Sequence, residues 1–277
     1  MDLARDKLDA LERVLDGIEQ IAVAVSGGVD SLTLAAAAHS RRPGHAKMFH
    51  AVSPAVPAEA TRRTETVAAQ RGWELQIIDA DEFADPSYRA NPVNRCFYCK
   101  TNLYGAIAPF TDAQIVSGTN TDDLGEYRPG LEAAKQHSVR HPFVEAGIDK
   151  KAVRAIAQHL GLRDIAELPS SPCLSSRIET GIAIDPGMLA LVHATEKLVI
   201  ETLKPRTVRC RVRANGVVIE LDDAQYAGLD LSQREDLGAQ VATLFREGGF
   251  DYSVRFASYR VGSAFLHKRS GPGVIEA

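Results

Sequence analysis

The sequence predicts an α/β protein, with a parallel sheet covered by helices on both faces and a small α+β domain after it. In the first half of the chain, short apolar runs typical of buried strands alternate with segments of helical spacing. The first apolar run ends in a glycine turn that opens a helix, a connection typical of nucleotide-binding sheets. After Pro169 the pattern changes to a hairpin with alternating apolar and charged residues. We therefore expect two domains, residues 1–168 and 169–277.

Each expected element follows from its hydrophobic spacing. An amphipathic helix at 3–18 opens the chain and lacks the features of a signal peptide. The expected strands of the first domain are 21–25, 48–52, 74–79 and 114–118, and its main helices are 32–38, 58–72, 102–109 and 150–160. The second domain is expected to contain helices at 186–203 and 231–246 and strands at 207–213, 217–221 and 252–256. Asn215-Gly216 is a strong hairpin signal. It would place Arg211 opposite Glu220 and Arg209 opposite Asp222.

Composition excludes several classes of protein. The chain has 277 residues, of which 45% are hydrophobic and 25% charged, as in globular proteins. A net charge of −4 supplies no basic field for nucleic acid. No apolar run is long enough to cross a bilayer, so we expect no membrane partner and a cytoplasmic location. Four cysteines in such a chain favour metal or redox chemistry over disulfides.

The string IAVAVSGGVDS, residues 21–31, combines a strand, a glycine turn and a helix start. The backbone N–H groups of such a turn and the positive end of the helix dipole attract phosphate. Five residues form the predicted phosphate loop: Ser26, Gly27, Gly28, Asp30 and Ser31. Asp30 is a candidate ligand for a Mg²⁺ ion that bridges phosphate oxygens. The loop is neither a Walker loop nor a GxGxxG dinucleotide turn, and the alternative is an ordinary turn of small residues.

A second polar loop follows the fourth expected strand. It contains the candidate nucleotide-binding residues Gly118, Thr119, Asn120, Asp122 and Asp123. Taken alone, such a run is typical of a turn. Because the carboxyl ends of parallel strands meet at one edge of a sheet, we expect both loops and residues 53–57 at a single nucleotide site.

Three cysteines are candidates for chemistry. Cys96 and Cys99 form a CxxC, which is compatible with zinc, a redox pair or coincidence. Together with Cys173 they would hold a [4Fe–4S] cluster with one open iron position. Zinc would need a fourth ligand such as His141 or Cys210, which the spacing does not support. Cys210 is expected to be a core thiol, whereas the setting of Cys173 beside Arg177 favours a thiolate.

Several strings in this order resemble known proteins. SGGVDS resembles the pyrophosphate loop of the ATP-pyrophosphatase superfamily. NRCFYCKTNLY, GTNTDDLGEYRPGL, SSPCLSSRI and RVRANGVVIEL resemble the LarE family of ATP-dependent sulfur transferases within it. The resemblance implies a HUP-like fold, ATP with Mg²⁺, and a homo-oligomer. It also implies that the substrate, pyridinium-3,5-biscarboxylic acid mononucleotide, is adenylated and converted to a thiocarboxylate for the nickel-pincer nucleotide cofactor of lactate racemase.

The resemblance also implies roles for particular residues. The family uses either a sacrificial cysteine at the position of Cys173 or a [4Fe–4S] cluster held by three cysteines. Cys96, Cys99 and Cys173 make this chain similar to the cluster-bearing branch. Ser176 and Arg177 accompany Cys173 in the catalytic string. The remaining implied positions are Arg209 and Arg211 for the substrate phosphate, and Glu196 and Glu220 for an acidic metal-binding pocket.

Other interpretations stay open at this point. Arg211 and Glu220 could instead form an ion pair on a solvated sheet face, worth ~0.2–1 kcal/mol. A tRNA thiolation enzyme of the same superfamily would need a basic surface that the net charge does not provide. An amidotransferase-type synthetase would not need the three cysteines. A non-catalytic nucleotide sensor would bind ATP without pyrophosphate exchange.

Overall fold

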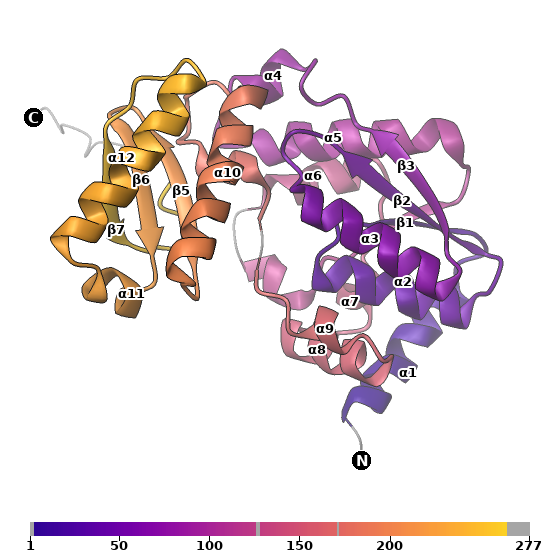
Figure 1. Cartoon of the computed structure of the whole chain (residues 1–277). Coiled ribbons are helices and arrows are strands. Elements are labelled where there is room, and N and C mark those ends of the chain that lie inside the picture. The colour runs from indigo at the N-terminus through magenta and orange to yellow at the C-terminus, as the bar shows by residue number, and fades with distance from the viewer. Residues whose placement is uncertain (1–2, 126–127, 171, 265–277) are drawn as a thin grey trace, which may run out of the picture. The chain divides into compact units, whose positions relative to one another are not determined.

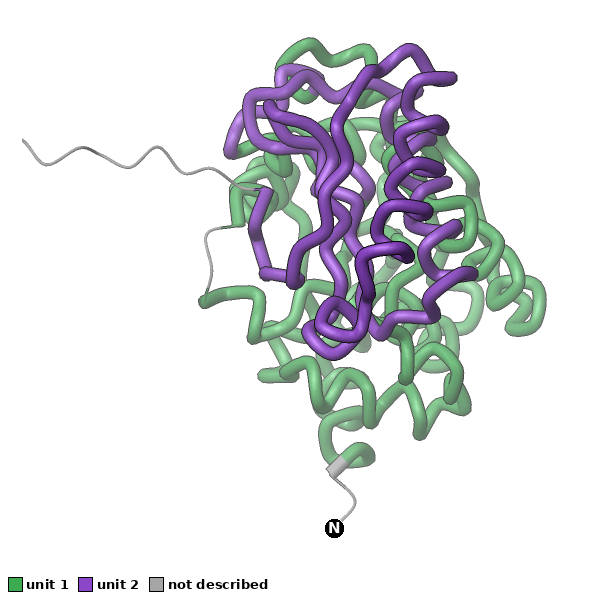
Figure 2. Tube along the Cα trace, turned by 60° about the vertical axis from the view of Figure 1, so that its left-hand side comes forward, with its two compact units in different colours: residues 1–88, 94–173 green, residues 89–93, 174–277 purple. Residues whose placement is uncertain are grey.

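The computed structural model describes residues 3–125, 128–170 and 172–264. The chain divides into two compact units, which Figure 2 shows in separate colours. Unit 1 contains Met1–Tyr88 and Asn94–Cys173, and unit 2 contains Arg89–Val93 and Leu174–Ala277. Tyr127, within the second nucleotide string, lies outside the described residues. The division between the units falls directly after Cys173, inside the cysteine string.

Unit 1 is built on a four-stranded parallel sheet of order β3-β2-β1-β4 (Figure 1). Its strands are β1 (Ile21–Ala24), β2 (Ala46–Val52), β3 (Glu74–Asp79) and β4 (Gln114–Ser117). Ile21 pairs with Ala46 on one side and Gln114 on the other, so β1 is central. The order places the carboxyl end of β1 between those of β2 and β4, as the phosphate-loop prediction requires.

Helices cover both faces of this sheet. They are α1 (Leu3–Asp16), α2 (Val29–Arg41), α3 (Ala58–Arg71), α4 (Pro86–Arg89), α5 (Arg95–Ile107), α6 (Pro129–Gln136), α7 (Pro142–Glu145), α8 (Lys150–His159) and α9 (Arg163–Ala166). Side chains of Ile21 and Val23 lie in the core shared with α1, α2 and α8, while Ala22 and Ala24 lie in the core shared with α5. Successive side chains of a strand point to opposite faces, so β1 is buried on both. The predicted fold class, α/β with helices on both faces, is confirmed.

Unit 2 contains a three-stranded sheet of order β5-β6-β7. Its elements are α10 (Pro186–Leu203), β5 (Val208–Arg213), β6 (Gly216–Leu221), α11 (Asp223–Gly228), α12 (Leu231–Glu247) and β7 (Val254–Ser258). β5 and β6 are antiparallel, whereas β7 runs parallel to β6. Asp185 and Asp230 cap α10 and α12 by accepting backbone N–H groups of their first turns. This mixed sheet with its helices is the expected small α+β domain.

The predicted hairpin loop was one residue too late, so the predicted cross-strand partners were wrong by two residues. Arg213 pairs with Gly216, so the two-residue loop is Ala214-Asn215. Arg209 therefore lies opposite Glu220, and Arg211 lies opposite Val218. Gly216 serves the sheet rather than the turn, because a Cβ atom there would lie 2.5 Å from the carbonyl oxygen of Ser253 before β7. A turn signal read locally cannot detect this approach of a third segment.

The helix that contains the CxxC was placed too late in the sequence. The structure begins α5 at Arg95, so both Cys96 and Cys99 are helical rather than in a preceding loop. Aromatic residues and cysteine have modest helix propensity, so the sequence around the CxxC gives a weak helix signal. The helix forms there nonetheless, because it buries Arg95, Tyr104 and Ile107. Strand β7 differs in the other direction, because it begins at Val254, two residues after its predicted start.

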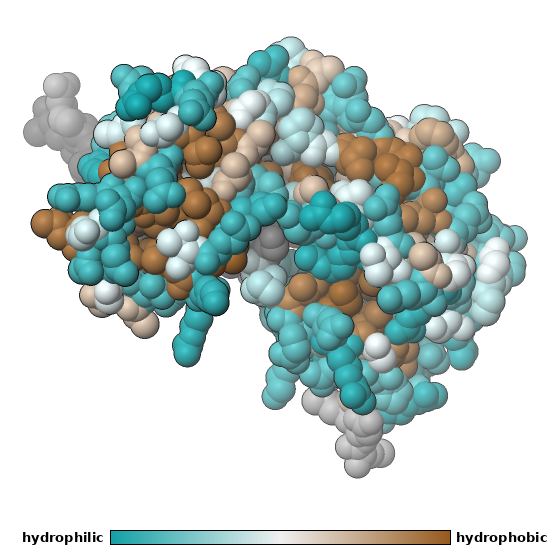
Figure 3. Space-filling view, viewed as in Figure 1, coloured by the Kyte–Doolittle hydropathy of each residue, from teal (hydrophilic) through white to brown (hydrophobic). Residues whose placement is uncertain are grey.

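The visible surface is mostly polar. Figure 3 shows teal residues over much of this face, with brown apolar residues in separate groups. Within the described residues, no helix has the length and apolar character needed to cross a bilayer.

Candidate nucleotide and sulfur site

The predicted phosphate loop connects β1 to α2 at the carboxyl edge of the unit 1 sheet. The N–H of Ser26 donates to Ser31 Oγ at 3.0 Å, and the two hydroxyls lie 3.1 Å apart. Gly27 adopts φ of 78°, and a Cβ atom there would lie 2.6 Å from the carbonyl oxygen of Ala60. The loop is therefore held tightly, with the first N–H groups of α2 directly behind it.

The second polar loop packs directly against the first. A Cβ atom on Gly118 would lie 2.8 Å from the backbone nitrogen of Ser31 and 2.9 Å from the carbonyl carbon of Asp30. Only glycine allows this approach without displacement of one of the two loops. The predicted neighbourhood of the two loops is thus found at the carboxyl ends of β1 and β4.

Asp30 joins three parts of unit 1. Its Oδ1 accepts from Asn120 Nδ2 at 3.1 Å, and its Oδ2 pairs with the ammonium group of Lys150. Lys150 is the first residue of α8, and its backbone N–H donates to Asp122 Oδ2 at 3.2 Å. Sequence reasoning missed Lys150. The sequence places Lys150 directly after Asp149, the N-cap of α8, and so at the start of a helix. It does not show that this helix start lies beside Asp30, which is 120 residues away in the chain.

The rest of the second loop is organised by its own carboxylates. Asp123 Oδ2 accepts the N–H of Asn120 at 3.1 Å and its Oδ1 pairs with Arg128 at 2.9 Å. Thr119 Oγ1 lies 3.2 Å from Ser117 Oγ, which also bonds His141 Nδ1 at 2.9 Å. Burial lowers the pKa of His141, which favours the neutral ring. Asp30 and Asp122 supply the hard oxygen donors that a Mg²⁺ ion prefers. Because Asn120 and Lys150 engage the two oxygens of Asp30, this carboxylate could bind the ion only after Lys150 leaves it.

Cys96 and Cys99 lie one turn apart on one face of α5 and are half-buried, whereas Cys173 is exposed. Burial raises the pKa of the Cys96 thiol, and the neighbouring Cys173 raises it further. Burial also raises the pKa of Cys99 to about 12, with Cys173 and Glu82 contributing. The three thiols are therefore near enough to influence one another electrostatically.

Lys100 and Glu82 accompany these thiols and were not identified from the sequence. Burial by itself would lower the pKa of Lys100, but Tyr104 and the three thiols outweigh it and raise the pKa. A charged ammonium group beside the thiols offsets negative charge that develops on sulfur. Glu82 is 4% exposed, its Oε2 has no hydrogen-bond partner in the described structure, and burial raises its pKa.

The thiols supply the soft donor atoms that an iron–sulfur cluster needs. In the part of the chain that the structure describes, however, no group of three or more His, Cys, Asp or Glu side chains is arranged to hold a metal ion. The donor type fits the expected cluster, but the described side chains are not arranged as a complete ligand group.

In unit 2, Arg177 and Glu196 form a buried bidentate ion pair. Arg177 Nε and Nη2 donate to the two carboxylate oxygens of Glu196 at 2.9 and 3.0 Å. Their side chains are 3% and 9% exposed. Glu196 Oε1 also accepts the backbone N–H of Cys210 at 2.9 Å, and Ser176 Oγ accepts from Arg177 Nη1 at 3.1 Å. The pair connects the cysteine string to α10 and β5. Cys210 is the buried core thiol that was expected.

Arg211 and Glu220 also interact, but not on a solvated face as one interpretation held. Arg211 Nε donates to Glu220 Oε2 at 3.0 Å, and the two side chains are only 5% and 3% exposed. Arg211 Nη1 donates to the carbonyl oxygen of Ser176 at 3.0 Å. Because both pairs are buried, removal of one partner would leave an uncompensated charge.

Neither glutamate fits a metal site in this arrangement. Both oxygens of Glu196 accept hydrogen bonds from Arg177. Glu220 Oε1 accepts from Arg213 Nη2 at 3.1 Å and from Ser263 Oγ at 2.7 Å, and its Oε2 is occupied by Arg211. Arginine groups therefore stand where a cation would bind, and we derive no metal chemistry from these residues.

Arg209 differs from Arg211 in its surroundings. Its guanidinium lies 5.7 Å from the centre of the Tyr259 ring, and Nη1 donates to the carbonyl oxygen of Val208 at 2.7 Å. Burial lowers the pKa of Arg209, and the positive charge of Arg177 lowers it further. An anion beside Arg209 would relieve this repulsion.

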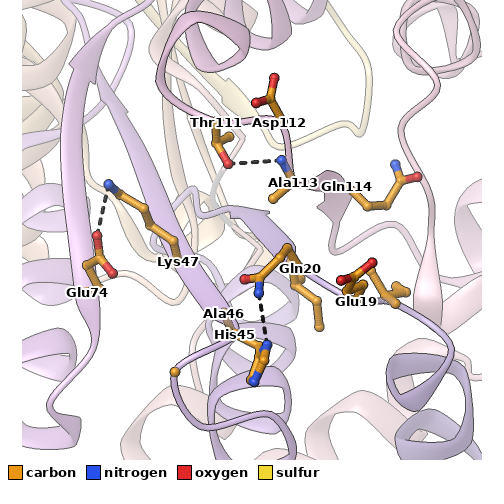
Figure 4. A pocket seen from close by; sticks show the side chains of 13 residues that line it. Glu19, Gln20, His45, Ala46, Lys47, Glu74, Thr111, Asp112, Ala113 and Gln114 are labelled. Atoms are coloured by element: carbon orange, nitrogen blue, oxygen red, sulfur yellow. Dashed lines mark hydrogen bonds and ion pairs between the residues drawn. The ribbon is translucent and has the colours of Figure 1, made fainter.

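One cavity of about 520 Å³ in unit 1 is lined by none of these residues. Figure 4 shows it at the amino ends of the unit 1 strands, with Gln20 bonded to His45 and Lys47 paired with Glu74 at 2.9 Å. Since ligands of parallel sheets bind at the opposite edge, this cavity is not the nucleotide site.

Comparison with known proteins places the chain among relatives that match it over most of their length. The uncharacterized protein slr1717 of Synechocystis is 35% identical over 254 residues, covering 90% of this chain and 93% of that protein. This chain belongs to the family of slr1717. Pyridinium-3,5-bisthiocarboxylic acid mononucleotide synthase of Lactiplantibacillus plantarum is 28% identical, covering 87% of this chain and 92% of the synthase. The uncharacterized protein MJ0830 of Methanocaldococcus jannaschii is 27% identical over 236 residues.

These relatives support the similarity to the LarE family that the motifs indicate. The named synthase also supports the conclusion that this protein is an enzyme. No family model matches the chain.

Proposed function

We propose that this protein is an ATP-dependent sulfur transferase that converts a carboxylate of pyridinium-3,5-biscarboxylic acid mononucleotide to a thiocarboxylate. The observation that carries the proposal is the packing of Gly118 against Asp30 and Ser31, which makes one polar site from two loops at the carboxyl edge of the sheet. Homology to a synthase named for the bisthiocarboxylic product supports the choice of substrate. The nickel-pincer cofactor of lactate racemase would be the final product of the pathway.

In the first step, a carboxylate oxygen of the substrate attacks the α-phosphorus of ATP and pyrophosphate leaves. The N–H groups of residues 26–31 and the start of α2 bind the phosphate oxygens. Lys150, released from Asp30, neutralises charge that develops on the departing pyrophosphate. Asp30 and Asp122 would hold a Mg²⁺ ion, which would offset the negative charge of the phosphates. The product of this step is an acyl adenylate.

In the second step, sulfur attacks the activated carbonyl carbon and AMP leaves with its bonding electron pair. Cys173 is exposed, so its sulfur is the accessible one among the three thiols. Cys96, Cys99 and Cys173 would hold a [4Fe–4S] cluster, which would supply a replaceable sulfide. Lys100 offsets negative charge at the thiols. Ser176 and Arg177 continue the chain from Cys173 and anchor it to Glu196.

The decisive assay separates the two steps. Pyrophosphate release and thiocarboxylate formation are measured with the mononucleotide for the wild type and for Cys173→Ala. We expect the variant to lose thiocarboxylate formation while it keeps part of its ATP–pyrophosphate exchange. Equal loss of both would contradict a role of Cys173 confined to sulfur delivery, and a wild type that forms no thiocarboxylate would refute the function.

The sulfur source is tested on protein purified and reconstituted without oxygen. Iron and acid-labile sulfide are measured together with the intact mass before and after turnover. Bound iron and sulfide with an unchanged mass supports the cluster. A colourless protein that loses ~34 Da, the mass of H₂S from one cysteine, would instead identify Cys173 as a sacrificial donor.

A further inference from the structure

The first turn of α3 packs against the phosphate loop. A Cβ atom on Gly27 would lie 2.6 Å from the carbonyl oxygen of Ala60 and 3.0 Å from its Cβ atom. Arg63 follows on the same helix, and its Nη1 donates to the carbonyl oxygen of Gly27 at 2.7 Å. A helix outside the strand, turn and helix of the loop motif therefore also holds the turn.

Arg63 makes this contact at a cost in hydration. Its side chain is half-buried, and burial lowers the pKa of its guanidinium group. Glu59 lies near enough to oppose this shift, but its Oε1 pairs with Arg62 at 3.2 Å. Among the described residues, Arg63 forms no ion pair, and its one hydrogen bond is to Gly27. The folded chain thus places a partly desolvated cation on a single carbonyl oxygen of the loop.

This hydrogen bond selects one orientation of the peptide between Gly27 and Gly28. The C=O and N–H groups of a trans peptide point in opposite directions, so a Gly27 carbonyl directed at Arg63 directs the Gly28 N–H away from it. Because neither glycine has a Cβ atom, steric contacts within the chain do not prevent this peptide from turning over. A turned peptide would present an oxygen, which repels phosphate, in place of the N–H donor.

The Gly28 N–H lies at the start of α2. Gly28 is the N-cap of this helix, and no side chain caps it. The first N–H groups of a helix have no partner within it, and an anion can satisfy them. The N–H of Ser26, by contrast, already donates to Ser31 Oγ at 3.0 Å. The orientation of one peptide therefore decides whether the turn offers a donor or an acceptor beside the helix start.

We propose that Arg63 is a positioning residue, which holds the Gly27–Gly28 peptide so that the Gly28 N–H faces the phosphates of bound ATP. The identity of the nucleotide rests on the proposed function, whereas the fixed peptide rests on the contacts described above. Hydrogen bonds from charged donors are stronger than those from neutral donors, so Arg63 suits this task. Its loss should release the peptide and leave the rest of α3 in place.

The first test is ATP binding by the full chain, measured by isothermal titration calorimetry. Arg63→Met keeps the apolar stem and removes the donor, so we expect the Kd for ATP to rise at least ~10-fold, or about 1.4 kcal/mol. Arg63→Lys keeps a charged donor and should stay within about threefold of the wild type. Arg62→Met is the matched control, because Arg62 is 64% exposed and pairs with Glu59 rather than with the loop. Circular dichroism checks that each variant is folded.

The second test observes the peptide itself. NMR of protein labelled with ¹⁵N-glycine reports the Gly28 amide, which Gly28→Ala assigns because a Cβ atom there meets nothing closer than Ser26 Oγ at 3.6 Å. Saturating inorganic pyrophosphate should shift this amide proton downfield in the wild type and in Arg62→Met, but not in Arg63→Met. A merely structural role of Arg63 would lower the melting temperature and leave the shift unchanged.

Three results would each overturn the proposal: wild-type ATP affinity in Arg63→Met, no recovery of affinity in Arg63→Lys, or a Gly28 shift that persists in Arg63→Met. Absence of ATP binding by the wild type would overturn both this proposal and the proposed function. Thiocarboxylate formation is a separate assay. Its failure in a wild type that binds ATP and shows the Gly28 shift would refute the proposed function and leave the role of Arg63 standing.

Discussion

Asn120 Nδ2 donates a hydrogen bond to Asp30 Oδ1 at 3.1 Å, joining two loops that are 90 residues apart in the chain. The contact lies beside the point where Gly118 meets the start of α2. With Lys150 on its second oxygen, Asp30 is held between an amide and an ammonium group. The candidate nucleotide site is thus one connected structure rather than two separate loops.

Replacement of Lys150 by alanine should lower ATP–pyrophosphate exchange about 100-fold, because a positive charge beside the leaving pyrophosphate is lost. The neighbouring Lys151 is exposed and serves as the control, since Lys151→Ala changes the same charge away from Asp30. Exchange is measured with labelled pyrophosphate and saturating substrate. Wild-type exchange in Lys150→Ala would show that the ammonium group only stabilises Asp30.

Gly118→Ala should raise the Kd for ATP at least tenfold, or about 1.4 kcal/mol or more. The added methyl group would lie 2.8 Å from the Ser31 nitrogen, so one of the two loops must shift. Gly125→Ala is the matched control, because a Cβ atom there meets nothing within 4 Å. ATP binding is followed by calorimetry, and equal affinities of the two variants would argue against a shared site.

Arg177→Met should destabilise unit 2 by about 3–5 kcal/mol, because Glu196 would remain buried without its partner. Arg246→Met changes an exposed arginine of the same unit and should alter stability by at most about 0.5 kcal/mol. Urea unfolding monitored by circular dichroism measures both. Faster hydrogen exchange of the Cys210 amide, which donates to Glu196, would localise the effect. A loss below about 1 kcal/mol in Arg177→Met would mean that water reaches the carboxylate.

Alkylation by iodoacetamide at pH 8 should modify Cys173 before Cys96 and Cys99 in the metal-free protein, because Cys173 is exposed. The Cys99 pKa of about 12 leaves little thiolate at pH 8, so its rate should rise roughly tenfold per pH unit until the pH approaches 12. Peptide mass spectrometry gives the order and the rates. Labelling of Cys99 ahead of Cys173 would contradict the described surroundings of the two thiols.

The same shift has a consequence for stability. The folded state keeps Cys99 protonated more strongly than an unfolded thiol of pKa about 8.5. Its contribution to stability is therefore complete below pH about 8.5 and declines as the pH rises from there toward 12. Cys99→Ser, measured by urea unfolding at pH 7 and pH 10, should show a smaller decrease in stability with pH than the wild type.

Local patterns were sufficient for much of unit 1. The strand Glu74–Asp79 and the helix Pro186–Leu203 of unit 2 lie where their spacing predicts. The position of the phosphate loop follows from the order strand, glycine turn, helix, which needs only neighbouring residues. The predicted hairpin register was wrong because glycine is needed at position 216 for the close approach of the Ser253 carbonyl group. The residues next to Gly216 in the sequence give no sign of this contact.

The sequence by itself determined the α/β class, the two loops at the sheet edge and the identity of the thiols, because periodicity and short motifs depend on neighbouring residues. Only the tertiary structure decided which partners these groups have. Lys150 reaches Asp30, and Arg177 and Arg211 pair with Glu196 and Glu220. Such electrostatic relationships depend on distance and burial in space, and both are set by how distant segments pack.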